Sequence, residues 1–144
     1  MMMNGMIKKQ LVNKEVATLL RDNGFNEPCF AYYSEYVDDG KTLKWWKGFR
    51  TYDTVKNKNY VLVPFIFTAM EWLRLKHNLF LNVGFGNDIN GDFLYMADIC
   101  DLTKDSVDGR YEPVVKADEY LDTNPKSPAE AINEALKHII INLI

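Results

Sequence analysis

The segment Trp45-Trp46-Lys47-Gly48-Phe49-Arg50 combines aromatic and basic side chains in a way that is typical of binding surfaces. Successive residues of a strand point to opposite faces, so a buried Trp45 would place Trp46 on the outer face unless a helix or a partner covers it. An exposed Trp beside cationic side chains is typical of a protein-binding hot spot or a base-stacking platform. The alternative is that both rings are buried between the sheet and the loop of residues 48–59. The candidate binding residues are Trp45, Trp46, Lys47, Phe49 and Arg50.

Nucleophilic catalysis would require Cys29 to act with His77 or His138. A catalytic thiol needs a base within hydrogen-bond reach and a third group that orients the base, and the spacing of these residues names no third group. His77 falls near the end of a predicted helix, where an imidazolium would favour the helix dipole, so a capping role is the simpler account. His138 is expected at a half-buried helix edge. We therefore predict no catalytic residue and no enzymatic activity.

Three further patterns resemble ligand sites, and each is better explained as a loop. The Gly84-Phe85-Gly86 run precedes a turn, whereas a dinucleotide fingerprint needs a third glycine and a helix N-terminus. A calcium loop aligned on Gly91 would place Ala97 where a bidentate Glu is required. The aspartates of residues 98–108 could gather around a cation, but a solvated acidic loop is the simpler account. We predict no cofactor and no metal. The aspartates considered are Asp98, Asp101, Asp105 and Asp108.

The first element is expected to be a helix that begins after Asn13 and ends at Gly24. Its apolar stripe runs to Leu20. Gly24 suits the left-handed residue just past a helix end, which places Phe25 where it can pack back onto Leu20 in a Schellman motif. Replacing Gly24 with Ala should therefore destabilise the protein by roughly 1 kcal/mol.

Two more helices are predicted from similar signals. Pro64 fits the first turn of a helix because its missing N–H costs nothing there, and apolar residues at helical spacing continue to His77. Ser127, with Glu130 three residues later, is a capping box that begins the last helix. We expect helices over residues 64–77 and from Ser127 onward.

Five strands are expected, because each segment alternates or is rich in aromatic and β-branched residues between turn signals. Asp38-Asp39-Gly40 closes the first hairpin and a loop over 87–92 closes the second. Pro113 has no N–H to donate to a neighbouring strand, so the last strand is expected at an edge of the sheet. Residues 48–59 show no periodicity and are interpreted as a surface connection. The expected strands cover residues 29–37, 42–47, 79–85, 93–100 and 111–117.

The resulting order is αββαβββα, which predicts an α+β fold: an antiparallel sheet of two hairpins plus an edge strand, packed by three helices. We expect one domain over residues 13–144 after a flexible N-terminal segment, residues 1–12. The second half has the element order of a double-stranded-RNA-binding domain. The acidic charge and the single Lys126 before the last helix count against that interpretation.

The composition disfavours several functional classes. The 144 residues include 17 Lys and Arg against 20 Asp and Glu, a formal net charge of −3, which lacks the electrostatic footprint of most nucleic-acid-binding proteins. The apolar run at residues 61–70 falls short of the ~20 residues that a membrane-spanning helix needs. The N-terminus has no features of a signal peptide, and the two cysteines suggest no disulfide framework. We expect a cytoplasmic protein without membrane contact.

Three segments of the sequence are distinctive: residues 19–33, 71–77 and 129–137. Their most specific parts are the runs Pro28-Cys29-Phe30-Ala31-Tyr32-Tyr33 and Trp72-Leu73-Arg74-Leu75-Lys76-His77. These segments resemble a group of small proteins encoded by bacteriophages and prophages of gut bacteria. The resemblance covers most of the chain, which departs from the group in having Val63 rather than Ala before Pro64. It implies an accessory protein of a mobile element in a bacterial cytoplasm, and it carries over no catalytic residue.

We therefore expect a non-catalytic module that binds a host or phage protein through its aromatic sheet face. The alternative is a nucleic-acid binder that uses the Trp45–Arg50 segment, with Lys44 and Lys56, as a local basic stripe. We also predict a homodimer, because the apolar residues at positions 139–141, 143 and 144 cannot all point toward one sheet. Ile141 and Ile144 are its predicted interface residues, joined by an exposed aromatic residue of the first hairpin, unless the 48–59 loop covers them within one chain.

Overall fold

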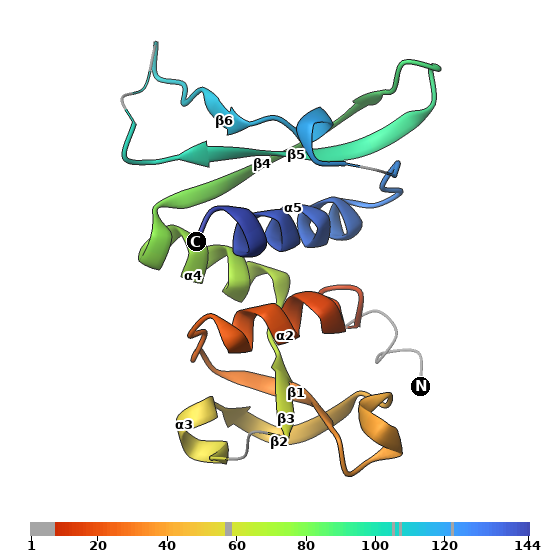
Figure 1. Ribbon diagram of the computed structural model, residues 1–144, viewed down its shortest axis with the longest axis vertical. Coiled ribbons are helices and arrows are strands. Elements are labelled where there is room, and N and C mark those ends of the chain that lie inside the picture. The colour runs from red at the N-terminus through yellow and green to blue at the C-terminus, as the bar shows by residue number, and fades with distance from the viewer. Residues whose placement is uncertain (1–7, 57–58, 105, 107, 122) are drawn as a thin grey trace. The chain divides into compact units, whose positions relative to one another are not determined.

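The computed structural model describes residues 8–144 except 57–58, 105, 107 and 122. The described residues form an α+β fold with two antiparallel sheets of three strands each (Figure 1). The chain divides into two compact units, Met1–Ala69 and Met70–Ile144, each with its own sheet. Among the described residues, no helix has the length and apolar character needed to cross a membrane.

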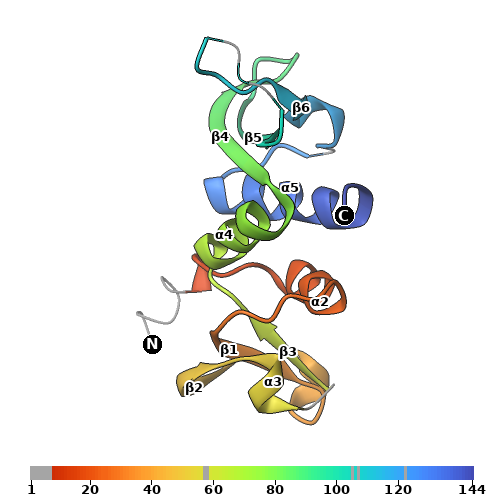
Figure 2. The same cartoon turned by 90° about the vertical axis from the view of Figure 1, so that its left-hand side faces the viewer.

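Unit 1 packs one long helix against its sheet, whose strand order is β2-β1-β3. The helix α2 lies along one face of the sheet in both views (Figures 1 and 2). Ala31 and Tyr33 of the central strand point toward α2, because Ala31 is fully buried and the Lys14 ammonium lies 5.2 Å from the centre of the Tyr33 ring. The elements of unit 1 are α2 (Lys14–Asp22), β1 (Cys29–Ser34), η1 (Asp38–Gly40), β2 (Lys44–Arg50), α3 (Tyr52–Val55) and β3 (Tyr60–Val63).

The two ends of α2 are fixed by the residues that the sequence indicated. The Asn13 side-chain oxygen accepts a hydrogen bond from the Val16 N–H at 2.8 Å. At the other end, the Phe25 N–H donates to the Leu20 carbonyl at 3.0 Å, and Gly24 has a φ of +89°. This is the Schellman ending that was predicted.

Strand β3 is an addition to the predicted elements. It pairs antiparallel with β1, with Ala31 opposite Val63 and Tyr33 opposite Val61. Its residues Val61, Leu62 and Val63 are all buried. A short apolar run buried on both faces shows no alternation, so the sequence pattern did not reveal this strand.

The start of the middle helix differs from the prediction. Helix α4 covers Ile66–His77, and Pro64 lies before it, outside the helix. The Pro64 carbonyl accepts a hydrogen bond from the Val12 N–H at 3.1 Å, and Phe65 forms a β-bridge with Leu11. These contacts keep residues 64–65 out of the helix, which therefore begins at Ile66 rather than at Pro64 as predicted. Leu11 and Val12 are buried, so the ordered chain begins before Asn13.

Unit 2 contains a long hairpin with a short third strand, in the order β4-β5-β6. Its nine residue pairs run without a break from Leu79 opposite Asp101 to Asn87 opposite Phe93. Helix α5 packs against β5 and β4, and β6 is an edge strand as predicted. Besides α4, the elements of unit 2 are β4 (Leu79–Asn87), β5 (Phe93–Asp101), β6 (Pro113–Val115), η2 (Ala117–Glu119) and α5 (Pro128–Asn142).

Helix α5 is capped by Ser127, whose hydroxyl oxygen accepts a hydrogen bond from the Glu130 N–H at 3.1 Å. The Glu130 carboxylate accepts from the Lys126 N–H at 2.8 Å, one residue earlier than a regular capping box would place it. The helix buries Ala131, Ala135, Leu136 and Ile139 almost completely, which makes it the main cover of the second sheet.

The α+β class and the order of the predicted elements are confirmed. The strands are divided between two sheets rather than gathered in one. The physical reason is that β3 completes the first sheet beside β1, while the second hairpin takes β6 as its third strand.

A candidate binding face on the first sheet

The two tryptophans of β2 contact different rings of β1, next to an irregular pairing of the two strands. Cys29 pairs with Arg50 and Ala31 with Trp45, so two steps along β1 correspond to five along β2. The extra residues break the alternation of side chains, as in a β-bulge. That Trp45 and Trp46 point to opposite faces stays a prediction. Both rings are partly buried, and each contacts an aromatic ring of β1.

Trp46 is held by contacts with neighbouring rings and with a cation. Its ring stacks on Tyr32 with 4.1 Å between centroids and 13° between planes. The Arg50 guanidinium carbon lies 5.6 Å from the centre of the same ring, a cation–π contact. Tyr60 of β3 completes the group, 5.3 Å from Tyr32 and 6.2 Å from Trp46.

A second group of rings surrounds Phe30. Trp45, Phe49 and Phe65 lie 5.1, 5.3 and 5.0 Å from it, centroid to centroid. Phe49 is 65% exposed, which is high for a phenylalanine. We call the six rings contributed by the three strands the aromatic face: Phe30, Tyr32, Trp45, Trp46, Phe49 and Tyr60.

Four of the five predicted binding residues lie in these two ring groups. Trp45 and Phe49 contact Phe30, whereas Arg50 contacts Trp46. Lys47 is exposed on the same strand. Lys56 lies instead at the end of α3, where it lines a separate pocket, so it does not continue a stripe along β2. The sequence pattern identified β2 but missed the aromatic residues of β1 and β3, which strand pairing brings beside it.

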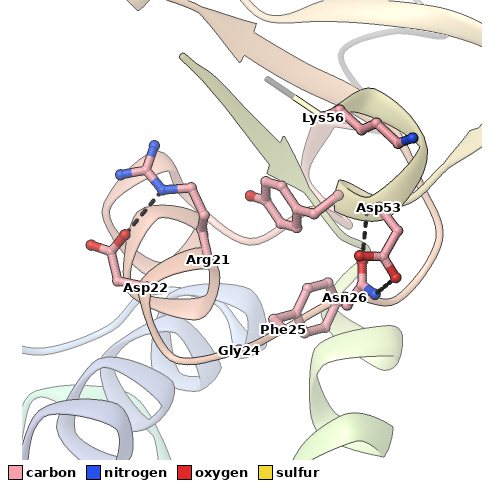
Figure 3. Close-up of a pocket in the computed structure, with 8 residues that line it drawn as sticks. Arg21, Asp22, Gly24, Phe25, Asn26, Asp53 and Lys56 are labelled. Atoms are coloured by element: carbon pink, nitrogen blue, oxygen red, sulfur yellow. Dashed lines mark hydrogen bonds and ion pairs between the residues drawn. The ribbon is translucent and has the colours of Figure 1, made fainter. Parts of the chain in front are cut away.

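That pocket, of about 760 Å³, lies between the end of α2 and α3 (Figure 3). The Asn26 amide donates to the Asp53 carboxylate at 2.7 Å, and the Arg21 guanidinium donates to Asp22 at 3.0 Å. These carboxylates already have polar partners within the protein. The pocket has no local pattern in the sequence, because Asn26 and Asp53 on its two sides are 27 residues apart in the chain. It is lined by Arg21, Asp22, Gly24, Phe25, Asn26, Tyr52, Asp53 and Lys56.

The candidate thiol is not activated. Cys29 is 2% exposed, and its Sγ donates to the Glu27 carbonyl at 3.5 Å. Burial, with a smaller effect of the Glu27 charge, raises the Cys29 pKa to about 12. A thiol with this pKa stays protonated at neutral pH and is a poor nucleophile.

The two histidines make ring contacts within unit 2. His77 lies edge-on to Trp72 with 4.9 Å between centroids. His138 stacks on Tyr120 at 5.0 Å. Both contacts are of the kind that stabilises packing, and the capping role predicted for His77 stays a prediction.

Two of the aspartates considered for a cation site accept hydrogen bonds from backbone N–H groups. Asp98 accepts from the Ala117 N–H at 2.8 Å, and Asp101 accepts from the Thr103 N–H at 2.9 Å. Asp105 lies outside the described residues. Within the described part of the chain, no three or more His, Cys, Asp or Glu side chains are grouped to hold a metal ion.

The predicted interface residues at the end of α5 are exposed, Ile141 at 56% and Ile144 at 37%. This confirms that the apolar residues there do not all face the sheet. Leu143 and Ile144 line a second pocket, of about 480 Å³, together with Leu79 at the start of β4. Whether these residues form an interface stays a prediction.

Comparison of the chain with models of protein families, with curated proteins and with solved structures found no match. The fold and the aromatic face therefore carry the functional argument.

Proposed function

We propose that this protein is a non-catalytic module that binds a host or phage protein through the aromatic face. In this proposal it is an accessory protein of a phage or prophage and works in the bacterial cytoplasm, as the resemblance of its sequence implies. The observation that carries the proposal is the pair of ring groups on this sheet, one around Phe30 and one around Trp46, with Phe49 exposed at 65%.

Preassembly of these rings favours protein binding. Tyr32, Trp46 and Tyr60 are held by one another and by Arg50, so little side-chain entropy is lost when a partner docks. Tryptophan, tyrosine and arginine are the residue types enriched in binding hot spots. The exposed Phe49 ring supplies an apolar anchor for a pocket of the partner.

Nucleic-acid binding is the second candidate, since exposed Lys47 and Arg50 flank the rings. Base stacking, however, needs an open ring face. Tyr32 covers one face of Trp46, and the Arg50 guanidinium also lies over this ring. The net charge of −3 further reduces non-specific attraction to phosphates. These observations favour a protein partner.

The test compares proteins captured from a lysate of the native bacterial host by three versions of the full chain. Phe49→Glu places a charge on the aromatic face, whereas Phe67→Glu makes the same change at a phenylalanine of α4 that is 79% exposed. We expect the wild type and Phe67→Glu to retain a protein that Phe49→Glu loses. If all three retain the same proteins, the aromatic face is not the binding site.

A fluorescence titration separates the second candidate. We expect single-stranded oligonucleotides to leave Trp fluorescence unchanged at low salt and micromolar protein. Quenching that weakens as salt rises would instead support nucleic-acid binding and contradict the protein-binding proposal.

A further inference from the structure

Strand β4 forms one of the two edges of the second sheet, and the short strand β6 forms the other edge. Strand β4 pairs only with β5, and Figure 2 shows it on the outer side of the sheet of unit 2. Its nine residues, Leu79–Asn87, include no charged residue and no proline. Natural proteins usually protect edge strands with charges, prolines or bulges. An edge without these features is suited to the addition of another strand.

On its side away from β4, strand β5 makes hydrogen bonds that show which backbone groups of β4 point toward the unpaired edge of β4. The Tyr95 N–H donates to the Pro125 carbonyl at 3.0 Å, and the Ala97 carbonyl accepts from the Tyr120 hydroxyl, so both backbone groups point away from β4. In an antiparallel pair, directly opposite residues point either toward each other or both away. Phe85 lies opposite Tyr95 and Val83 opposite Ala97.

Val83 and Phe85 therefore direct their N–H and C=O groups toward the free edge. By the alternation of the strand, Leu79, Leu81 and Asn87 do the same. These five residues present a continuous row of backbone donors and acceptors.

This row of backbone groups can pair with the same row in a second copy of the chain. When two β4 strands run antiparallel with Val83 opposite Val83, each outward residue faces an outward residue of the other copy. Leu81 then lies opposite Phe85, and Leu79 opposite Asn87. The absence of charge is important here, because a twofold axis brings like residues close together and like charges would repel.

The other face of the strand is also complementary to its copy. In the same register Phe80 lies opposite Gly86 and Asn82 opposite Gly84, so each larger side chain meets a glycine. The Met96 methyl already lies over Gly86, only 2.5 Å from where a Cβ would stand. The Phe80 ring of the second copy would pack against this methionine, a favourable contact of sulfur with an aromatic ring.

The register also brings together two apolar surfaces that are exposed in one copy. Phe85 is 73% exposed, and Leu143 and Ile144 at the end of α5 are 40% and 37% exposed. The α5 end lies beside Leu79, because these residues line one pocket. Phe85 of the second copy would sit opposite Leu81, two residues from Leu79 on the same side of the sheet. The ring and the helix end would then cover each other.

We propose that the partner of this edge is a second copy of the chain, joined through β4–β4 pairing about a twofold axis at Val83. The two sheets of unit 2 then form one continuous antiparallel sheet. This inference is independent of the proposed function, since it uses the edge of the second sheet and not the aromatic face.

Sedimentation equilibrium of the full chain at micromolar concentration tests the proposal. Val83→Pro removes an outward N–H and leaves the hydrogen bonds to β5 in place, so it should block pairing while the sheet persists. Phe85→Lys is a second variant at an exposed position. Ile89→Lys is the matched control, since Ile89 is 99% exposed and lies in the hairpin loop outside β4.

We expect the wild type and Ile89→Lys to form a dimer. For Val83→Pro and Phe85→Lys, the dissociation constant of the dimer should rise at least about tenfold. Circular dichroism checks that each variant is folded. A monomeric wild type would overturn the proposal. So would a folded Val83→Pro or Phe85→Lys that dimerises as the wild type does.

A charge-swap experiment tests the register. Gly84 and its copy are diagonal neighbours in this pairing, and a Cβ at Gly84 meets no atom within 4 Å. Gly84→Lys and Gly84→Glu should each weaken the homodimer, and their mixture should restore dimerisation. No recovery in the mixture would contradict the pairing about Val83.

Discussion

At the scale of single residues, Gly24 is the position where backbone conformation most clearly determines the sequence. Its φ of +89° is unfavourable for residues with a Cβ, and an added Cβ would meet no atom within 4 Å. The cost of Gly24→Ala is therefore conformational rather than steric, and we expect it to be about 1 kcal/mol.

The measurement is the urea midpoint of unfolding. Gly48→Ala is the matched control, because Gly48 is also free of neighbours within 4 Å and its φ is not positive. We expect the control to unfold near the wild-type midpoint. Equal midpoints for the two variants would show that the left-handed conformation of Gly24 is not the source of the cost.

Tyr52 is a second residue with a measurable role. Its hydroxyl accepts a hydrogen bond from the Leu62 N–H at 2.8 Å, and burial raises its pKa. Tyr52→Phe leaves a partly buried donor without its partner, which should cost about 1–3 kcal/mol. Tyr36→Phe is the control: the Tyr36 hydroxyl accepts from Asn59, but Tyr36 is 73% exposed and water can replace it. Equal denaturant midpoints for both variants would contradict this role.

These two residues also show what sequence could and could not predict. The conformation of Gly24 followed from local chemistry, since a glycine after an apolar helical stripe typically ends the helix. The contact of Tyr52 with Leu62 depends on β3, which had no alternating pattern to reveal it. Local rules identified the helix end, whereas the tyrosine contact required tertiary structure.

At the scale of elements, the capped start of α5 is the best specified helix end in unit 2. Ser127→Ala removes the acceptor for the Glu130 N–H and should cost about 1 kcal/mol. Ser127→Asp restores an acceptor at the same position and should recover most of the stability. Thermal unfolding followed by circular dichroism compares the two variants. If both lose the same stability, the cap is not the cause.

Strand β2 shows why the candidate site was only half predictable. Its composition predicted a binding role for Trp45–Arg50, and the tryptophans of this segment belong to the aromatic face. Trp45 contacts Phe30 and Trp46 contacts Tyr32, next to the irregular pairing between Cys29 and Ala31. Such a bulge is set by the pairing of two strands, so one strand's sequence does not contain it.

At the scale of the whole molecule, the division into two units had no signal in composition. The boundary falls between Ala69 and Met70, inside α4, whereas domain boundaries are expected in polar or glycine-rich linkers. The sequence has the length of one domain and no visible interdomain linker, so one domain was predicted. Two separate sheets could be recognised only from strand pairing.

Self-association provides the last prediction, because β4–β4 pairing assigns different roles to two neighbouring isoleucines. Ile144 lines the pocket beside Leu79, near the place that Phe85 of the second copy would occupy. Ile141 is more exposed, at 56%, and lies outside that pocket. A charged side chain placed beside the apolar contact of Phe85 with the α5 end should weaken the dimer, because burying a charge is costly.

We therefore expect Ile144→Glu to raise the dissociation constant of the dimer and Ile141→Glu to leave it unchanged in sedimentation equilibrium. Neither change should greatly alter the stability of one copy, because both side chains are exposed. The sequence alone had assigned both residues to the interface together with a ring of the first hairpin. The opposite outcome, a dimer lost with Ile141→Glu and kept with Ile144→Glu, would favour an interface on the outer side of α5, away from β4.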